Sequence, residues 1–348
     1  MELTEATNKN TLFVVVDSSD VYWRECFSDE DFSQYTIRII DGQYITAESF
    51  LIGDVFFKNA QLRTLLYLFQ KNEVRNGDIF VFANAWNFIT IPLSFFKHEF
   101  NLDIKLIGFW NNSLFNRASP MFRRLDSKNG WGYNFEMSLF KAYDLNCFFC
   151  KEHQEMFSRR NYASRQEVGV VTGLPFGYLR KKVQSVEKHN IIFTPEPITD
   201  EIHSRVFAGL SFDFKEYSLV VASKTHFTRF KYNELLKAAK VLYCVKQTEY
   251  DPAVIYEAML NGIIPILPKR MFLEMIFPKE YFYERQSPKI KRNIYLFMIR
   301  NRLEMIEFIS KKVDNYEEWK LKVKSDAETI EQEYFSNTKF LTELNKIL

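Results

Sequence analysis

Two carboxylates in the second half of the chain, Glu249 and Glu257, have the type and spacing to do chemistry. Glu257 is the only charged residue in the apolar helical segment 253–260, and burying an unpaired carboxylate is costly. The hydroxyl groups of a ligand can supply the hydrogen bonds that such a carboxylate needs. Glu249 precedes Glu257 by eight residues, on the loop that leads into the helix. The pair therefore predicts a binding site for a hydroxyl-bearing ligand.

The segments around this pair predict a strand, a loop, a capped helix and a second strand. Val241–Val245 is apolar and partly β-branched, which is typical of a buried strand. Asp251 is a good N-cap, and Pro252 stands where the first helical residue is expected. Gly262 suits the left-handed position that ends a helix, and Ile263–Leu267 reads as the next strand. A phosphate group can bind at the N-terminus of such a helix.

The spacing E-x7-E, followed by Ala, Gly and the strand I-P-I, resembles the donor-site signature of retaining GT-B glycosyltransferases. The resemblance implies that Glu249 contacts the donor sugar and that Glu257 binds the nucleotide ribose. It also implies a nucleotide sugar, with UDP-sugar the first choice, as co-substrate, and no further cofactor. The alternative is a β-α-β core unit in which one glutamate is solvated and the other is paired with a cation.

Composition limits the possible functions. A chain of 348 residues accommodates two domains, and a net charge of +2 is no sign of general polyanion binding. Four cysteines with one C-x2-C pair indicate neither a disulfide framework nor a zinc site. The segment 29–31 has the letters of an acidic metal-binding pair but no strand before it, so we interpret it as solvated. We expect no bound metal.

The polar N-terminus does not resemble a signal peptide, and no segment is apolar enough to span a membrane. These features predict a soluble, cytoplasmic protein. Nothing in the sequence indicates an obligate protein partner.

Strand and helix patterns alternate along the chain, which predicts parallel sheets with right-handed crossovers. The expected strands are 11–16, 36–40, 78–82, 105–109, 145–149, 167–171, 190–194, 217–222, 241–245 and 263–267. The expected helices are 61–71, 92–100, 134–143, 151–160, 200–210, 232–239, 252–261 and 294–311, followed by the helical segment 315–348. A charged stretch at 180–189 predicts the linker between two Rossmann-like domains.

The predicted fold is therefore α/β of the GT-B type, with two Rossmann-like domains facing each other across a cleft. The expected boundaries are 1–183 for an acceptor domain, 184–310 for a nucleotide-sugar domain and 311–348 for a helical tail. The resemblance implies that the last helix crosses back to the first domain.

The segment 110–131 follows a strand and mixes basic with aromatic residues. Such a segment lies at the carboxyl edge of a parallel sheet, where open α/β sheets bind ligands. Interleaved basic and aromatic side chains suit phosphate contacts and base stacking. The candidate residues for binding the acceptor substrate are Trp110, Arg117, Arg123, Arg124, Lys128 and Trp131. The alternative is an ordinary long loop with an aromatic anchor.

Three stretches, among them IGFWNNSLF at 107–115, are similar to glycosyltransferases encoded by bacteriophages. Some of those enzymes glycosylate 5-hydroxymethylpyrimidines, so the resemblance implies double-stranded DNA as acceptor. It also implies that a phage-encoded protein of this kind acts in the host cytoplasm. A glycan or a lipid-linked acceptor stays open. Asn111 and Asn112 stand where a histidine often faces the sugar. Asparagine is no base, but in a retaining mechanism the donor phosphate can accept the proton.

One departure from the family pattern concerns the donor diphosphate. An arginine and a lysine usually follow the first strand of the second domain, whereas this chain reads FTPEPITDE there. Lys224, Arg229 and Lys246 are the candidates to replace them, and Tyr250 and Asp251 complete the expected donor site. The missing pair leaves open a non-catalytic protein that binds a nucleotide or a glycan.

Overall fold

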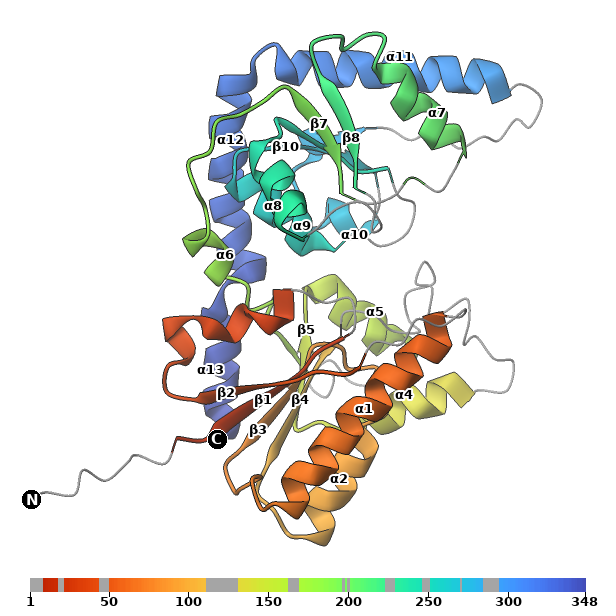
Figure 1. Ribbon diagram of the computed structural model, residues 1–348. Helices are drawn as coiled ribbons and strands as arrows, with labels where there is room; N and C mark the ends of the chain where they lie inside the picture. Colours follow the sequence, from red (N-terminus) through yellow and green to blue (C-terminus); the bar gives the residue numbers. More distant parts are fainter. Residues whose placement is uncertain are drawn as a thin grey trace, which may run out of the picture. The chain divides into compact units, whose positions relative to one another are not determined.

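The computed structural model describes residues 9–17, 22–43, 50–110, 131–161, 169–195, 198, 201–222, 229–245, 251–269, 271–283 and 294–348 (Figure 1). The chain forms two compact units. Unit 1 comprises Met1–Tyr178 and Tyr334–Leu348, and unit 2 comprises Leu179–Glu333. Each unit is built around its own parallel sheet.

The sheet of unit 1 has six strands in the order β2-β1-β3-β4-β5-β6, all of them parallel. The strands are β1 Thr11–Val15, β2 Thr36–Ile40, β3 Ile79–Phe82, β4 Lys105–Trp110, β5 Leu145–Phe148 and β6 Val170–Val171. The central strands are apolar on both faces because helices cover both sides of a parallel sheet. The predicted strands of the first half are confirmed to within a few residues.

Four helices cover one face of this sheet (Figure 1): α1 Phe50–Gln70, α2 Thr90–Glu99, α4 Trp131–Ala142 and α5 Lys151–Asn161. Leu65 of α1 and Leu93 of α2 are fully buried against Phe13 and Phe80, whose rings stack with centroids 4.7 Å apart. Helix α1 begins eleven residues before the predicted start at Gln61, because its first turns carry no regular apolar spacing that reveals them in the sequence.

The other face of the sheet is covered by three short 3₁₀ turns and by the last helix, α13 Asn337–Ile347. The turns are Tyr22–Arg24, Cys26–Ser28 and Glu30–Phe32. The ring of Phe340 packs on Phe109 at 5.3 Å, and Asn337 Nδ2 donates to Asp31 Oδ2 at 3.0 Å. The last helix therefore returns to unit 1, as predicted. The prediction that residues 29–31 are solvated is wrong for Asp29, which is buried under this helix.

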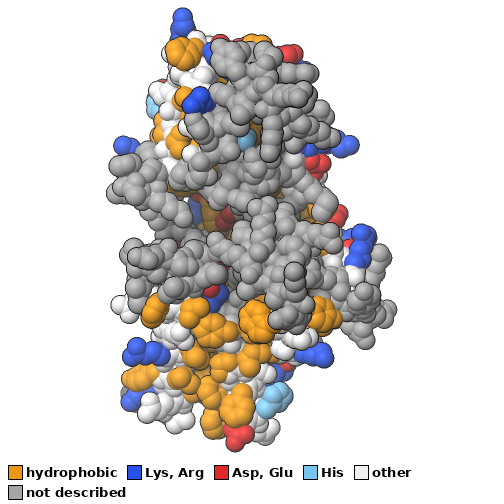
Figure 2. Space-filling model, turned by 90° about the vertical axis from the view of Figure 1, so that its right-hand side faces the viewer, with side chains coloured by type: hydrophobic (Ala, Val, Ile, Leu, Met, Phe, Trp, Pro, Cys, Tyr) orange, Lys and Arg blue, Asp and Glu red, His pale blue; other side chains and the backbone are white. Residues whose placement is uncertain are grey.

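The helical face of unit 1 also carries hydrophobic side chains in contact with solvent, which gather in the lower part of Figure 2. They come from α1, α2, the residue after α2 and the first residue of α4: Val55, Phe56, Leu66, Tyr67, Ile91, Phe95, Phe100 and Trp131. The chain has 35 phenylalanines, and this group shows that not all of them serve the core.

The sheet of unit 2 has five strands in the order β11-β10-β9-β7-β8, again parallel. The strands are β7 Ile191–Thr194, β8 Ser218–Val221, β9 Val241–Tyr243, β10 Ile264–Pro268 and β11 Phe282–Tyr283. The helices are α6 Tyr178–Lys181, α7 Glu201–Leu210, α8 Arg229–Ala238, α9 Pro252–Leu260, α10 Met271–Glu274, α11 Ile294–Val313 and α12 Tyr316–Ile330. A 3₁₀ turn at Lys279–Tyr281 precedes β11, and a π-helical turn, Glu331–Phe335, follows α12.

The division of the chain differs in detail from the predicted boundaries. Unit 1 ends at Tyr178, before the charged stretch that predicted the linker. The predicted boundary after residue 310 lies inside α11, which continues without a break to Val313. The predicted tail is itself divided, because α12 belongs to unit 2 and α13 to unit 1.

Candidate functional site

The strand order of unit 2 reverses at β7, because β8 lies on one side of it and β9 on the other. Open α/β sheets bind ligands outside the carboxyl ends of the strands at such a reversal. The loop after β9 leads into helix α9, so the N-terminus of α9 lies at this edge. Asp251 and Glu257, two of the residues predicted for the donor site, therefore belong to the helix whose N-terminus lies at this edge.

Helix α9 begins and ends as its sequence predicts. Asp251 is extended (φ −67°, ψ 113°), and its Oδ1 accepts a hydrogen bond from the amide of Ala253 at 2.9 Å. Gly262 has a φ of +75°, which a residue with a Cβ adopts only under strain. Tyr316 of α12 donates its hydroxyl to the carbonyl of Gly262 at 3.0 Å. These contacts hold the helix at both ends, so its N-terminus presents oriented amide groups.

Glu257 lies on the same stripe of α9 as Ala253, one turn nearer the C-terminus. Helical side chains lean towards the N-terminus, so Glu257 is directed to the end of α9 that lies at the sheet edge. Five of its helical neighbours are fully buried, but Glu257 itself is half-buried. The prediction of a buried carboxylate is therefore wrong in degree. A half-buried carboxylate remains accessible to a ligand.

Thr194 is a polar residue at this edge that sequence reasoning missed. It is the last residue of β7 and is only 1% exposed. Its hydroxyl oxygen has no hydrogen-bond partner among the described residues. The sequence feature that could have identified Thr194 is a threonine at the end of an apolar strand, directly before a proline. Its hydroxyl is a candidate donor to a ligand oxygen at the reversal of the sheet.

Several predicted donor residues lie outside the described residues, namely Lys224, Lys246, Glu249 and Tyr250. Arg229 is the first residue of α8, and only its backbone is described. The structure thus brings Asp251 and Glu257 together on one helix, and it leaves the remaining donor residues as predictions.

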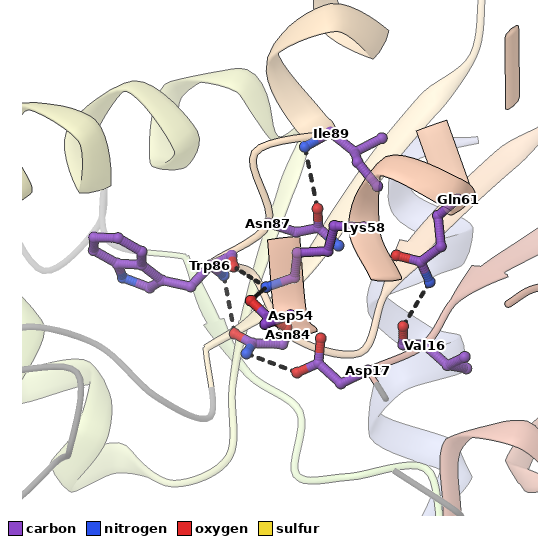
Figure 3. A network of polar contacts seen from close by, with 9 residues as sticks. All are labelled: Val16, Asp17, Asp54, Lys58, Gln61, Asn84, Trp86, Asn87 and Ile89. Atoms are coloured by element: carbon purple, nitrogen blue, oxygen red, sulfur yellow. Dashed lines mark hydrogen bonds and ion pairs between the residues drawn. The ribbon is translucent and has the colours of Figure 1, made fainter. Parts of the chain in front are cut away.

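The strand order of unit 1 also reverses, at β1, which has β2 on one side and β3 on the other. The residues that follow these strands form a polar network (Figure 3). Asn84, after β3, donates its Nδ2 to Asp17 Oδ2, after β1, at 2.8 Å. The Oδ1 of Asn84 accepts from the amide of Trp86 at 3.0 Å, which fixes the orientation of the Asn84 side chain.

Helix α1 supplies the other side of this network. Lys58 is 6% exposed, and its Nζ donates to Asp54 Oδ2 at 2.9 Å and to the carbonyl of Trp86 at 3.3 Å. The indole Nε1 of Trp86 donates in turn to Glu136 Oε2 at 2.7 Å, and Glu136 is fully buried. The network therefore joins the ends of β1 and β3 to helices α1 and α4.

The electrostatics of the network centre on Asp17. Burial raises the pKa of its carboxyl group above the usual range, and the charge of Asp54 acts in the same direction. The charge of Lys58 and the hydrogen bond from Asn84 lower the pKa, but burial outweighs them. Asp17 nevertheless keeps part of its surface accessible. Asp17, Lys58 and Asn84 were not among the functional residues predicted from the sequence.

Most of the predicted acceptor-binding residues, together with Asn111 and Asn112, lie in 111–130, outside the described residues. Trp110 is described and is fully buried in β4, where its Nε1 donates to Asn146 Oδ1 at 2.8 Å. Its ring also stacks on Phe148, so it has no face for a substrate, and we no longer count it as an acceptor-binding residue. Trp131 begins α4, is 55% exposed and stacks on Phe135.

The cysteines act as core residues. All four are buried and reduced, and burial raises the pKa of the Cys150 thiol to about 12. Within the described ranges no group of three or more His, Cys, Asp or Glu side chains is placed to hold a metal ion. None of the described helices is both long and apolar enough to cross a lipid bilayer.

The two parallel α/β units define a GT-B-type fold, as predicted. No protein-family profile matches the sequence, and no curated protein sequence matches it. The chain is similar in structure to UDP-GlcNAc 2-epimerase from Neisseria meningitidis bound to UDP-GlcNAc, with a TM-score of 0.55 and 10% identity over 96% of this chain and 98% of that one. It is also similar to the pneumococcal O-GlcNAc transferase GtfA in complex with UDP and GlcNAc, with a TM-score of 0.52 and 10% identity over 84% of this chain. The match spans 60% of the GtfA chain.

Proposed function

We propose that this protein is a glycosyltransferase that moves a sugar from a nucleotide sugar, with a UDP-sugar as the first choice, to a hydroxyl group. The observation that carries the proposal is α9: a helix capped by Asp251, at the reversal of a parallel sheet, with a half-buried carboxylate directed to its N-terminus. The likeness of fold to two proteins solved with UDP or UDP-GlcNAc supports it.

In the proposed complex the amide groups at the N-terminus of α9 face the diphosphate, and Glu257 accepts hydrogen bonds from the ribose hydroxyls. Glu249 approaches the sugar, and Lys224, Arg229 and Lys246 replace the missing arginine–lysine pair. Thr194 adds a hydroxyl donor at the end of β7. The oriented helix amides reduce the number of cations that a diphosphate requires, because they carry partial positive charge.

The reaction that we propose retains the configuration of the sugar. The acceptor oxygen bonds to the anomeric carbon while the bond from that carbon to the phosphate oxygen breaks. The electron pair leaves with the nucleoside diphosphate, and the proton of the hydroxyl passes to the departing phosphate. No divalent metal is required in this scheme, so activity that EDTA abolishes and manganese restores would contradict it.

The first experiment measures the binding of UDP by calorimetry. The variant Glu257→Ala should bind UDP about 10- to 150-fold more weakly, because hydrogen bonds to a charged group contribute about 1.5–3 kcal/mol. Glu318→Ala, which removes an exposed carboxylate from α12, is the control and should bind UDP as the wild type does. Wild-type affinity in Glu257→Ala would remove Glu257 from the donor site.

The second experiment separates transfer from other nucleotide-sugar chemistry. Labelled UDP-glucose and UDP-GlcNAc are incubated with the wild-type protein, with and without acceptors, and the products are identified. A transferase releases UDP in proportion to the amount of acceptor that becomes labelled. Conversion of UDP-GlcNAc to an epimer without any acceptor would contradict the proposal. Binding of UDP without any turnover would identify the non-catalytic alternative.

For the acceptor we propose a 5-hydroxymethylpyrimidine in double-stranded DNA, bound through Arg117, Arg123, Arg124 and Lys128, with Trp131 as an exposed aromatic surface. Transfer should label a duplex with 5-hydroxymethylcytosine or 5-hydroxymethyluracil and spare unmodified DNA. Binding should weaken with salt, with a slope of about −0.9 per phosphate neutralised. If a glycan or a lipid-linked sugar is labelled and neither modified duplex is, the DNA acceptor is wrong.

A further inference from the structure

The polar network at the sheet edge of unit 1 contains more polar side chains than folding requires. Asp54, Lys58 and Gln61 are spaced four and three residues apart, so they share one face of α1. That face meets Asp17, which follows β1 at the reversal, and Asn84, which follows the neighbouring strand β3. Five polar side chains from three segments thus converge at the point where a ligand is expected in an α/β sheet.

One member of this group has an unused hydrogen-bonding atom. Gln61 is fully buried, and its Nε2 donates to the carbonyls of Val16 at 2.7 Å and Ile40 at 2.8 Å. Its Oε1 has no partner among the described residues. In Figure 3 the Gln61 amide group points from α1 to the end of β1, where Val16 leads directly into Asp17. A buried oxygen without a donor costs about 1–3 kcal/mol, so Gln61 is a second polar group at this edge whose placement folding alone does not explain.

The balance of charges shows which ligand fits. Lys58 is the only described cation in the network, and its ammonium group is engaged by Asp54 and by the carbonyl of Trp86. Asp17, which keeps part of its surface accessible, is therefore the hydrogen-bond acceptor that this edge offers to a ligand. A phosphate, which brings negative charge and further acceptor atoms, is unfavourable beside Asp17. A neutral group that brings O–H donors is favourable.

We propose that Asp17 binds a hydroxyl group of the acceptor substrate at this edge of unit 1. This assignment rests on the proposed function. It places the neutral, hydroxyl-bearing part of the acceptor at Asp17 and leaves any phosphates of the acceptor to the basic residues of the segment 111–130.

The surroundings of Asp17 suit this role. Asn84 holds one carboxylate oxygen, which fixes the side chain and leaves the other oxygen for a ligand. Burial disfavours the charged form of Asp17, and a hydroxyl donor would compensate for the hydration that the carboxylate has lost. A raised pKa means that ionised Asp17 lowers the stability of the fold. An asparagine at this position would avoid that cost, so stability alone does not explain the aspartate.

The test measures direct binding of three small probes to the wild-type protein by saturation-transfer NMR: methyl glucoside, 5-hydroxymethyl-2′-deoxycytidine and inorganic phosphate. We expect one of the two neutral probes to bind. Binding of methyl glucoside would indicate a glycan acceptor, and binding of the deoxycytidine would indicate a nucleoside acceptor. In Asp17→Asn the affinity for that probe should fall about ten-fold or more, the scale of a lost hydrogen bond to a charged group. Phosphate should not displace it.

Asp41→Asn is the matched control. Asp41 follows β2 at the same sheet edge but is exposed, and it pairs with Arg24 at 2.9 Å outside the network. The Asp41→Asn variant should bind the neutral probe as the wild type does. The melting temperatures of all variants show whether each one folds. Failure of both neutral probes to bind the wild type, or equal binding by Asp17→Asn, would overturn the proposal.

A measurement on the wild type keeps the test decisive if Asp17→Asn does not fold. Protonated Asp17 is a poorer hydrogen-bond acceptor, so the neutral probe should bind more weakly as the pH falls through the raised pKa of Asp17. Among the residues that the structure describes, the charged groups that face Asp17 are Lys58 and Asp54 of α1. Tyr143, whose own pKa is raised by burial, stays neutral throughout. Binding that is independent of pH would contradict the role of Asp17. UDP affinity is measured in parallel, so that loss of the donor site is distinguished from loss of this one.

Discussion

Replacement of Asp251 separates the structural role of a helix cap from its electrostatic effect on a bound diphosphate. The Asp251 carboxylate accepts from the amide of Ala253 at 2.9 Å and is exposed to solvent. Asp251→Ala removes this bond, and the loss of an N-cap costs about 1 kcal/mol. For a unit of this size that corresponds to a fall in melting temperature of about 2–4 °C. Asp251→Asn retains a good cap, so its melting temperature should stay near that of the wild type.

The two variants should differ in UDP affinity as well. The Asp251 carboxylate lies at the helix N-terminus, where the diphosphate is proposed to bind, and repels it. Removal of that charge in Asp251→Asn should strengthen UDP binding up to about five-fold at low salt, which corresponds to about 1 kcal/mol of repulsion in a solvent-exposed setting. In Asp251→Ala the same gain is offset by fraying of the first turn.

The assay is calorimetric titration with UDP at low and high salt, combined with thermal unfolding. The gain in Asp251→Asn should shrink at high salt, because exposed charges are screened. Ser336→Ala is the matched control: Ser336 caps α13 of unit 1 through the amide of Thr338 at 3.2 Å. It should lower the melting temperature and leave UDP affinity unchanged. If neither Asp251 variant changes UDP affinity at any salt concentration, the diphosphate does not bind at the N-terminus of α9.

Two further predictions concern stability. Gly262→Ala should lower the free energy of unfolding by about 1 kcal/mol or more, because φ is +75° and the new Cβ would lie 2.9 Å from Lys320 Cγ; equal urea midpoints for variant and wild type would contradict this. The second prediction follows from Asp17, whose raised pKa means that the native state binds more protons than the unfolded state between about pH 4 and the raised pKa. Ionised Asp17 therefore costs stability, and this cost appears as the pH rises from the ordinary aspartate pKa through the raised one. Asp17→Asn should remove the cost, so the difference in melting temperature between this variant and the wild type should grow in favour of the variant from about pH 3 to about pH 7, a span that begins below the ordinary aspartate pKa of about 3.9. A variant that is less stable at neutral pH would show that Asp17 supports the fold.

Features that depend on neighbouring residues were predictable from the sequence. The ends of α9 follow from Asp251, Pro252 and Gly262, because a cap bond spans two residues and a left-handed glycine needs no distant partner. The parallel sheets follow from apolar segments that alternate with helical patterns, and the strand limits agree within a few residues. Glu257 was identifiable as a lone charge on an apolar helix, although its degree of burial was not.

Features that depend on strand order were decided only by the tertiary structure. Asp17 and Asn84 are 67 residues apart, and they meet because β1 and β3 are neighbours at the point where the sheet reverses. Asn337 and Asp31 are 306 residues apart, and their contact depends on the return of α13 to unit 1. Trp110 looked like part of a ligand-binding loop, but the register of β4 against β5 places it in the core. A sequence reports which side chains are polar, whereas hydrogen bonds between distant segments exist only once the sheet has brought those side chains together.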